Sequence, residues 1–191
     1  MFYDIKQFPF LQTILDNIDI IIEEFENSTN MELISDFKHN DYPEINSHIL
    51  YYAKDQSITL EDLGYDFRNE SWGAFPLYKK GFEIKWYNVL EHFPKTSQLI
   101  SNVPNTYFSA FVKLIKNNGI LPHKHNDKNI ILHVCLYDLD GYSELYCGEQ
   151  KKVLKNKGDW AIFDSSIEHH SFNFSNTNRI NFVVDFPKID K

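Results

Sequence analysis

GILPHKHNDKNIILH, at residues 119–133, is the stretch of this sequence that decides its fold, and FDSSIEHHSFN (163–173) and NRINFVVDF (178–186) complete the pattern. Neutral imidazoles suit borderline divalent metals, and two of them with open positions and a nearby carboxylate are typical of a non-haem iron site. An arginine is the side chain that best holds a carboxylate in a bidentate fork. His123, His169 and Arg179 together therefore predict an iron oxygenase that uses a keto-acid co-substrate.

The composition is that of a globular protein, with 42% hydrophobic and 24% charged residues. An aromatic share of 16% favours β-sheet, because aromatic residues fit half-buried sheet surfaces. A length of 191 residues predicts a single domain spanning residues 1–191. The net charge of -8 offers no basic surface to a phosphate backbone, which argues against a nucleic-acid partner.

The two cysteines, Cys135 and Cys147, do not make a disulfide framework in a chain of this length. We predict that both are reduced and structural, as in a reducing compartment. The sequence has no basic-plus-apolar signal peptide, and no apolar run approaches the ~20 residues that span a bilayer. We therefore expect a soluble, cytoplasmic protein with no membrane partner.

Hydrophobic periodicity divides the chain at about residue 70. Helical spacing of apolar residues predicts an amphipathic helix over residues 8–27, and a short helix at 57–63 is predicted within the polar remainder of this part. From Trp72 onward, short aromatic and β-branched runs alternate with turns. The predicted fold is mainly β: a helical and irregular segment (1–70) packed on a double-stranded β-helix core (71–187), the jelly-roll or cupin-like barrel.

Seven runs in the second part are predicted to be strands, with a proline-started helix at 93–100. The first two form a hairpin through a Lys-Lys-Gly turn, and Asn118-Gly119, Asp140-Gly141 and Lys157-Gly158 are further turns. The strands are residues 72–78, 82–88, 109–115, 129–139, 143–148, 159–164 and 179–186.

The metal ligands beyond the first histidine allow alternatives. If the segment HKHND is extended, His123, His125 and Asp127 point to one face, because side chains alternate along a strand. Two sets therefore compete: His123 with His125, or His125 with Asp127 as a His-x-Asp pair. Of the adjacent His169 and His170, only one is expected to reach the metal.

The closing strand carries the candidate co-substrate residues. A charge inside an apolar strand is costly unless it is paired, so Arg179 either binds the keto-acid's distal carboxylate or forms a structural ion pair with Asp185. Asn181, two residues on, adds a donor to the same carboxylate. His133 is either a core histidine or a hydrogen-bond partner of the co-substrate. Asp164 caps the turn before His169 or orients a ligand.

Residues from about 70 to 187 resemble the aspartyl/asparaginyl β-hydroxylase family of Fe(II)- and 2-oxoglutarate-dependent dioxygenases. The resemblance rests on a tryptophan block before a glycine, a Pro-x-Thr-x-x-Leu segment, the entry into the first histidine, a Phe-Asp-x-Ser-x-x-His block and a closing arginine strand. In this sequence these blocks are WGAFPLYKKG (72–81), FPKT (93–96) with Leu99-Ile100, AFVKL (110–114) with ILPH (120–123), FDSSIEHHSFN (163–173) and RINFVVD (179–185).

The resemblance implies roles for individual residues. His123 and His169 would bind Fe(II), Arg179 would bind the distal carboxylate of 2-oxoglutarate, His133 would lie beside that co-substrate, and Trp72 would line the pocket. Members of the family carry an aspartate two residues after the first histidine or leave that place to water. Here His125 occupies that position and is the tentative third ligand, and Asp127 is the alternative if the strand shifts.

Two positions depart from the family pattern. An arginine often stands two residues before the strand histidine, where this chain has Ile131, and a serine often stands eleven residues before the first histidine, where it has Val112. Both positions are associated in the family with holding carboxylates. Either Lys113, Asn181 or another side chain compensates, or the co-substrate is held more weakly than is usual in the family.

We expect a dioxygenase that uses Fe(II), 2-oxoglutarate and O2 to hydroxylate an unactivated carbon of an amino acid, a peptidyl or carrier-tethered residue, or an amino-acid-derived small molecule. A cupin-like metalloenzyme with three histidines and no keto-acid is the first alternative. A non-catalytic barrel that binds a small anion through Arg179 is the second.

Overall fold

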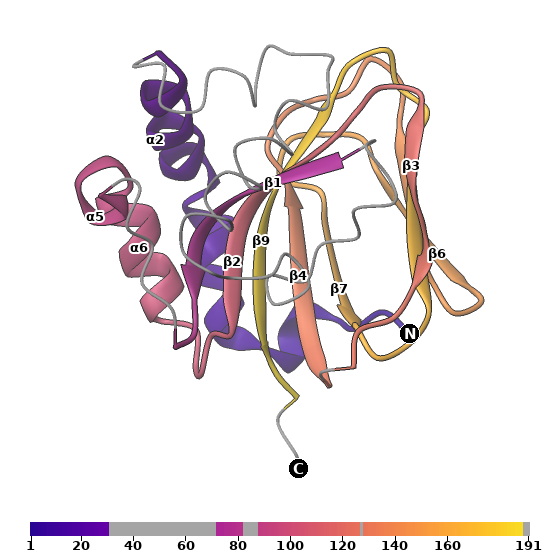
Figure 1. The fold of residues 1–191 in the computed structure, drawn as a ribbon, viewed down its shortest axis with the longest axis horizontal. Coiled ribbons are helices and arrows are strands. Elements are labelled where there is room, and N and C mark those ends of the chain that lie inside the picture. The colour runs from indigo at the N-terminus through magenta and orange to yellow at the C-terminus, as the bar shows by residue number, and fades with distance from the viewer. Residues whose placement is uncertain (31–71, 82–87, 127, 189–191) are drawn as a thin grey trace.

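Short strands with alternating side chains assemble into two antiparallel sheets that face each other, as Figure 1 shows. The computed structural model describes residues 1–30, 72–81, 88–126 and 128–188. Within these residues the fold is mainly β, and the predicted jelly-roll architecture is confirmed. The predicted boundary near residue 70, the short helix at 57–63 and most of the predicted strand at 82–88 lie outside the described residues.

The two sheets differ in size. The larger sheet has the order β1-β2-β9-β4-β7, formed by Trp72–Lys79, Phe108–Leu114, Arg179–Pro187, Asn129–Cys135 and Trp160–Asp164. The smaller sheet has the order β3-β8-β5-β6, formed by Asn118–His123, His169–Asn173, Ser143–Cys147 and Gln150–Leu154. Strands β3, β6 and β8 were not predicted from the sequence, although an extended conformation was considered around His123.

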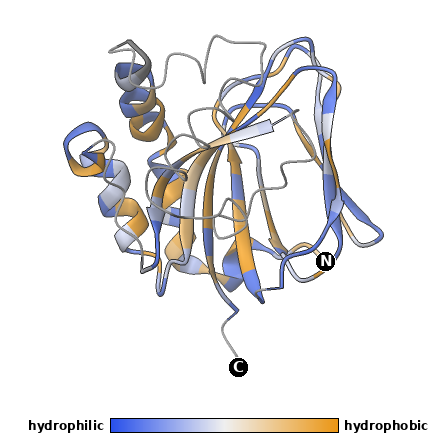
Figure 2. Ribbon diagram, viewed as in Figure 1, coloured by the Kyte–Doolittle hydropathy of each residue, from blue (hydrophilic) through white to orange (hydrophobic). Residues whose placement is uncertain are grey.

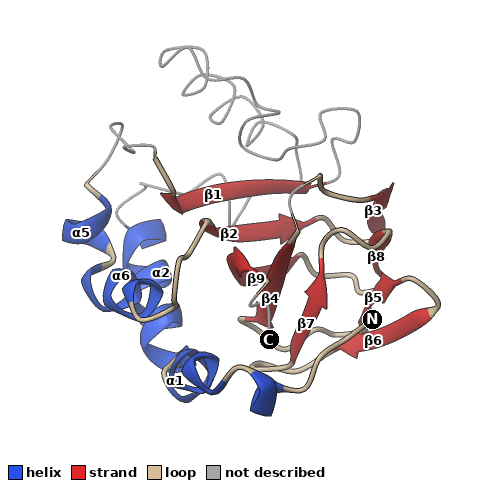
Figure 3. Ribbon diagram, turned by 90° about the horizontal axis from the view of Figure 1, so that it is seen from below, coloured by secondary structure: helices blue, strands red, loops and turns tan. Residues whose placement is uncertain are grey.

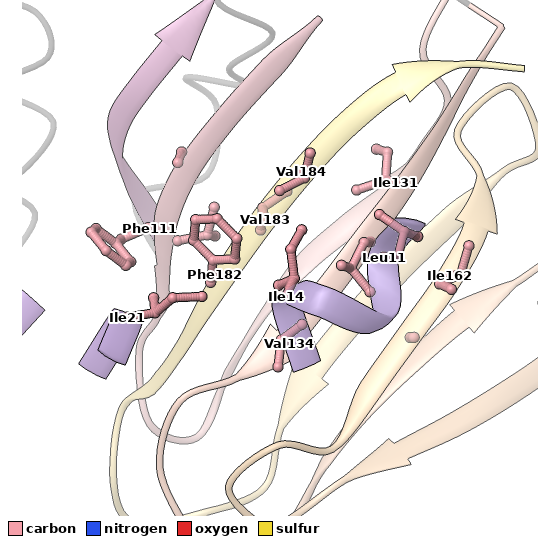
Figure 4. Close-up of a cluster of buried hydrophobic side chains, with 14 of the residues drawn as sticks. Leu11, Ile14, Ile21, Phe111, Ile131, Val134, Ile162, Phe182, Val183 and Val184 are labelled. Atoms are coloured by element: carbon pink, nitrogen blue, oxygen red, sulfur yellow. The ribbon is translucent and has the colours of Figure 1, made fainter. Parts of the chain in front are cut away.

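The larger sheet has an outer face covered by helices and an inner face that looks into the barrel (Figures 1 and 3). Because side chains alternate along β9, Phe182 and its alternate neighbours point outward. Phe182 meets Phe111 with ring centroids 5.9 Å apart, and Phe111 meets Phe25 of α2 (Ile18–Asn30) at 4.7 Å. Figure 4 shows Leu11, Ile14 and Ile21 of the N-terminal helices in the same cluster.

Hydrophobic residues are concentrated where the helices meet the larger sheet, whereas the smaller sheet is more hydrophilic (Figure 2). The outer cluster therefore provides the main core, and it leaves the barrel interior available for polar groups. Burial of such a cluster stabilises a fold by roughly 25 cal/mol per Å² of apolar surface removed from water.

The N-terminal segment is a series of short helices rather than the single helix predicted over residues 8–27. Asn17 lies at the break with φ −117° and ψ 23°, and its side chain donates to the carbonyl of Thr13. Asparagine competes with the backbone for hydrogen bonds, which explains an interruption at this residue. The helical elements are η1 (Ile5–Gln7), η2 (Pro9–Leu11), α1 (Gln12–Asp16), α2 (Ile18–Asn30), α5 (Val89–His92) and α6 (Pro94–Ser101).

A buried carboxylate joins the two helical regions. Glu24 of α2 accepts hydrogen bonds from the backbone N–H groups of Lys95 and Thr96, both at 2.9 Å. These N–H groups belong to the first turn of α6, which has no partner for them within the helix. Glu24 therefore caps α6 from another element of the chain.

The turn predicted at Asn118-Gly119 lies one residue earlier. Asn117 has a positive φ of 51°, and β3 already begins at Asn118. Asparagine tolerates the left-handed region, so the turn does not need the glycine there. Gly119 instead lies beneath Phe172, where a Cβ atom would come within 2.8 Å of the ring.

Both cysteines are free and buried, as predicted. Among the described residues, no helix is long and apolar enough to cross a membrane.

Candidate metal and anion site

Three imidazoles meet at one end of the smaller sheet. His123 ends β3 and is the cross-strand partner of His169, the first residue of β8. His125 follows two residues after β3, and its backbone N–H donates to the carbonyl of Ser165 at 2.9 Å. One ligand nitrogen from each of the three rings lies within 4.8 Å of the others. Such a group has the size and the donor chemistry of a divalent-metal site.

A bulge in β3 turns His123 toward the interior. Ile120 pairs with Ser171, but the next recorded pair joins His123 to His169, so β3 advances three residues while β8 advances two. A β-bulge changes which side chain points to which face, and a proline such as Pro122 is tolerated at one. Without the bulge, strict alternation from Ile120 would place His123 on the outer face.

Backbone carbonyls fix the protonation of two of the rings. Nδ1 of His123 lies 2.7 Å from the carbonyl oxygen of Leu121, and Nδ1 of His169 lies 2.8 Å from that of Ile167. A carbonyl only accepts, so each Nδ1 carries the proton and each Nε2 presents a lone pair. This is the arrangement that a histidine adopts when Nε2 binds a metal.

Two histidines of the interior, His169 and His133, are held in the neutral form. Burial, reinforced by the nearby His123, lowers the pKa of His169 to about 3. Burial and the charge of Arg179 hold the pKa of His133 well below its usual range. Because both pKa values are low, both rings are neutral at neutral pH. Neutral imidazole is the form that binds a metal.

The turn between β7 and β8 positions His169. Asp164 accepts hydrogen bonds from the backbone N–H and the hydroxyl of Ser166, at 2.9 and 2.6 Å, and from Lys188 at 2.9 Å. Burial alone would raise the pKa of Asp164, but these hydrogen bonds lower it overall. Asp164 thus caps the turn, as predicted, and the turn supplies the Ile167 carbonyl that holds His169.

The structure distinguishes the two adjacent histidines. His169 is buried and faces the interior, whereas His170 points outward and stacks on Tyr146 with ring centroids 4.4 Å apart. Of the two, His169 belongs to the group of three imidazoles and His170 does not. Asp127, the alternative ligand, lies outside the described residues.

Arg179 is fully buried inside the barrel at the start of β9. Its Nη1 donates to the hydroxyls of Ser143 and Ser171, while Nε and Nη2 have no hydrogen-bond partner among the described residues. Burial lowers the pKa of Arg179 to about 10, so the guanidinium stays protonated at neutral pH. The alternative ion pair with Asp185 does not form, because that residue is six positions away on the same strand, about 20 Å at a rise of ~3.3 Å per residue.

The inner face of the larger sheet also carries His133 and Asn181. Nδ1 of His133 lies 3.0 Å from Nδ2 of Asn181, which links adjacent strands. Oδ1 of Asn181 is buried and has no hydrogen-bond partner in the described part of the chain. The His133 ring packs on Phe163, and Phe163 packs on His169, with centroid distances of 5.6 and 5.0 Å. Through Phe163 and Asn181, His133 therefore connects the imidazole group with β9, the strand that carries Arg179.

The two departures from the family pattern line the same interior. Val112 is the cross-strand partner of Asn181, and Ile131 lies two residues before His133 on β4, on the same face. Trp72 pairs with Leu114, the partner of Arg179. Lys113 is buried on the opposite face, since it follows Val112 directly on β2. Lys113 therefore does not compensate for the missing serine.

Ser143 and Ser171 contact Arg179, but the sequence did not predict them as site residues. Alternation would have placed Ser171 on the same face as His169, which was the signal available. Contact between Ser143 and Arg179, however, depends on how the two sheets face each other.

The family model for aspartyl/asparaginyl β-hydroxylase matches residues 16–188 of the chain. No curated protein sequence matches it. Among solved structures, the cupin domain of Schizosaccharomyces pombe Cnp3 is 10% identical with a TM-score of 0.43, over 62% of this chain and 66% of that domain, just under two thirds of its length. TT1209 from Thermus thermophilus is 14% identical with a TM-score of 0.42, over 69% of this chain and 98% of that one. KdgF from Halomonas sp. is 12% identical with a TM-score of 0.40, over 66% of this chain and 86% of that one.

Proposed function

The chain belongs to the aspartyl/asparaginyl β-hydroxylase family, and from this we propose that it is a hydroxylase that depends on Fe(II), 2-oxoglutarate and O2. Its proposed substrate is an amino acid, a peptidyl or carrier-tethered residue, or a small molecule derived from an amino acid. The proposed reaction replaces an unactivated C–H bond with C–OH.

The observation that carries the proposal is the shared interior of the imidazole group and Arg179. Three imidazoles offer nitrogen ligands, and Arg179 offers a buried positive charge with two nitrogens that have no described partner. A keto-acid with a second carboxylate has the chemistry to meet both: one end chelates a metal, and the other takes a bidentate arginine. A buried charge without a counter-charge is costly, so an anionic ligand also removes a penalty.

His123, His169 and His125 would hold Fe(II), which when bound with 2-oxoglutarate supplies the oxidising chemistry. The protein's own part is placement. The carbonyls of Leu121 and Ile167 orient the ligand rings, and the turn capped by Asp164 holds the second of these carbonyls in place.

The remaining interior residues would position ligands and exclude water. Arg179 would hold the distal carboxylate, and Asn181 would fix the ring of His133 beside the co-substrate. Phe163 lies between His133 and His169 and makes this wall of the site apolar. Trp72 would line the pocket on the side of β1 and β2.

The three-imidazole group also favours a second candidate, a metalloenzyme that works without a keto-acid. Three neutral ligands give the metal no negative charge, in contrast to a site with a carboxylate. This candidate does not explain why a buried arginine has two nitrogens without described partners.

Succinate formation from 2-oxoglutarate tests the proposal. The protein with Fe(II) and O2 should release succinate slowly even without its substrate, and His169→Ala should abolish the release. Arg179→Ala should raise the 2-oxoglutarate concentration that is needed, and His170→Ala, on the outer face, serves as the matched control. Metal binding without succinate release under any condition would favour the second candidate.

A further inference from the structure

Two serines of the smaller sheet hold the guanidinium of Arg179. Ser143 of β5 and Ser171 of β8 accept hydrogen bonds from Nη1 at 2.6 and 2.7 Å. Both serines are buried, and they lie on adjacent strands, where Ser171 pairs with Leu145. The arginine comes from the other sheet, so its head group is held across the barrel.

The proton of each serine hydroxyl is already used. Ser143 donates to the carbonyl of Phe172 at 2.8 Å, and Ser171 donates to the carbonyl of Glu144 at 2.7 Å. A hydroxyl has one proton, so its remaining capacity is to accept. In this arrangement neither serine can donate to a bound anion, and both present lone pairs to Arg179.

The hydrogen bonds to the serines decide which edge of the guanidinium is available. Nη1 has two N–H bonds, and both are directed at serine oxygens. Nε and Nη2, which have no partner among the described residues, carry parallel N–H bonds along the side edge of the group. That edge matches the two oxygens of a carboxylate in a bidentate pair.

We propose that Ser143 and Ser171 are positioning residues that present the side edge of Arg179 to the distal carboxylate of the co-substrate. The inference rests on the proposed function, because it specifies how that carboxylate is bound. It also explains how the arginine can be positioned although Val112 stands where the family often has a serine. The chain has no hydroxyl at that position, and its two serines act on the arginine instead of on the ligand.

The test measures dicarboxylate binding separately from the metal centre. Glutarate, which has two carboxylates and no keto group, is titrated into metal-free protein by calorimetry. Ser143→Ala and Ser171→Ala should each weaken glutarate binding about tenfold or more, the size expected for losing a hydrogen bond to a charged group. Threonine at either position keeps the hydroxyl and should restore most of the affinity.

Ser109→Ala is the matched control. Ser109 is also a buried strand serine, and its hydroxyl donates to the carbonyl of Val183 at 2.8 Å, but it lies on the outer face of the sheet. Its replacement should leave glutarate binding unchanged. A general loss of structure in the two alanine variants would be seen as a loss of metal binding, which we expect to be preserved.

A second readout separates positioning from structural damage. In Ni(II)-loaded protein, the serine variants should lose affinity for 2-oxoglutarate but not for pyruvate, which chelates a metal and lacks the distal carboxylate. Equal losses for both keto-acids, or alanine variants that bind glutarate as tightly as the wild type, would overturn the positioning role while the proposed function stands. If wild-type protein binds neither dicarboxylate, the proposed function fails together with this inference.

Discussion

His123 and His169 face each other across the β3–β8 pair, with ring centroids 4.3 Å apart, and each holds its Nδ1 proton on the carbonyl two residues before it. The two Nε2 lone pairs are thereby set before any metal arrives. His125 completes the group from a segment whose backbone is held by Ser165. Preorganised ligands lose little conformational entropy on binding, which favours a tight site.

His125→Ala tests whether the third imidazole is a ligand. We expect this variant to bind Fe(II) or Ni(II) at least ~10-fold more weakly than wild type, because one of three nitrogen ligands is lost. His169→Ala should bind no metal. Calorimetric titration under anaerobic conditions gives both affinities. An unchanged affinity in His125→Ala would mean that water or Asp127, not His125, occupies the third position.

The stability of the metal-free protein should depend on His169. Its pKa is about 3 in the folded protein against an ordinary value of 6.5, so this residue favours folding fully above pH 6.5 and less as the pH falls toward 3. At pH 5 the loss from this residue is about 2 kcal/mol. Urea unfolding at pH 7 and pH 5, in the presence of a chelator, measures it.

His169→Gln provides the comparison, because glutamine has no proton to gain. The difference in unfolding free energy between pH 7 and pH 5 should shrink in this variant by about the same ~2 kcal/mol. Equal pH dependence in variant and wild type would show that protonation of His169 is not linked to unfolding.

The sequence predicts most of the strands and the candidate ligand residues, but it does not predict the contacts between the two sheets. Alternation along RINFVVDF placed Arg179 and Asn181 on one face, and their burial inside the barrel agrees. The bulge at Leu121 and Pro122 turns His123 inward. Simple alternation of side chains along a strand does not predict such a bulge. The sequence therefore identified His123 as a candidate but gave no reason for its direction.

Local sequence patterns do not predict contacts between the two sheets across the barrel. Ser143 contacts Arg179 over a separation of 36 residues, and nothing in the segment SELYC distinguishes that serine from a structural one. The helix breaks at Asn17, whereas the spacing of apolar residues predicted one continuous helix there. The apolar pattern favours a continuous helix at this point, but asparagine favours an interruption. The hydrogen bond from the Asn17 side chain to the Thr13 carbonyl accompanies the interruption.

An anion should stabilise the metal-free protein through Arg179. Binding to the folded state alone raises stability by RT ln(1 + [L]/Kd), about 2.7 kcal/mol when the ligand is at 100 times Kd. Thermal unfolding with increasing 2-oxoglutarate should therefore show a rising Tm. Arg179→Met, which keeps the length of the side chain and removes its charge, should show no rise, and an equal rise would place the anion elsewhere.

Glu24→Gln tests the connection between α2 and α6 without touching the site. The charged carboxylate accepts from the N–H groups of Lys95 and Thr96, and its replacement should cost about 1–3 kcal/mol of unfolding free energy. Urea denaturation measures the loss. Metal and 2-oxoglutarate affinities should not change, and a large change in either would show that the helices and the barrel interior are coupled.

The central claim is that one interior binds Fe(II) through its histidines and 2-oxoglutarate through Arg179. An anaerobic titration with Fe(II) and 2-oxoglutarate tests it most directly, because a keto-acid chelated to Fe(II) gives a visible metal-to-ligand charge-transfer band. We predict a band that is absent in His169→Ala and that needs far more 2-oxoglutarate in Arg179→Ala. Iron bound with no band at any 2-oxoglutarate concentration would contradict the account.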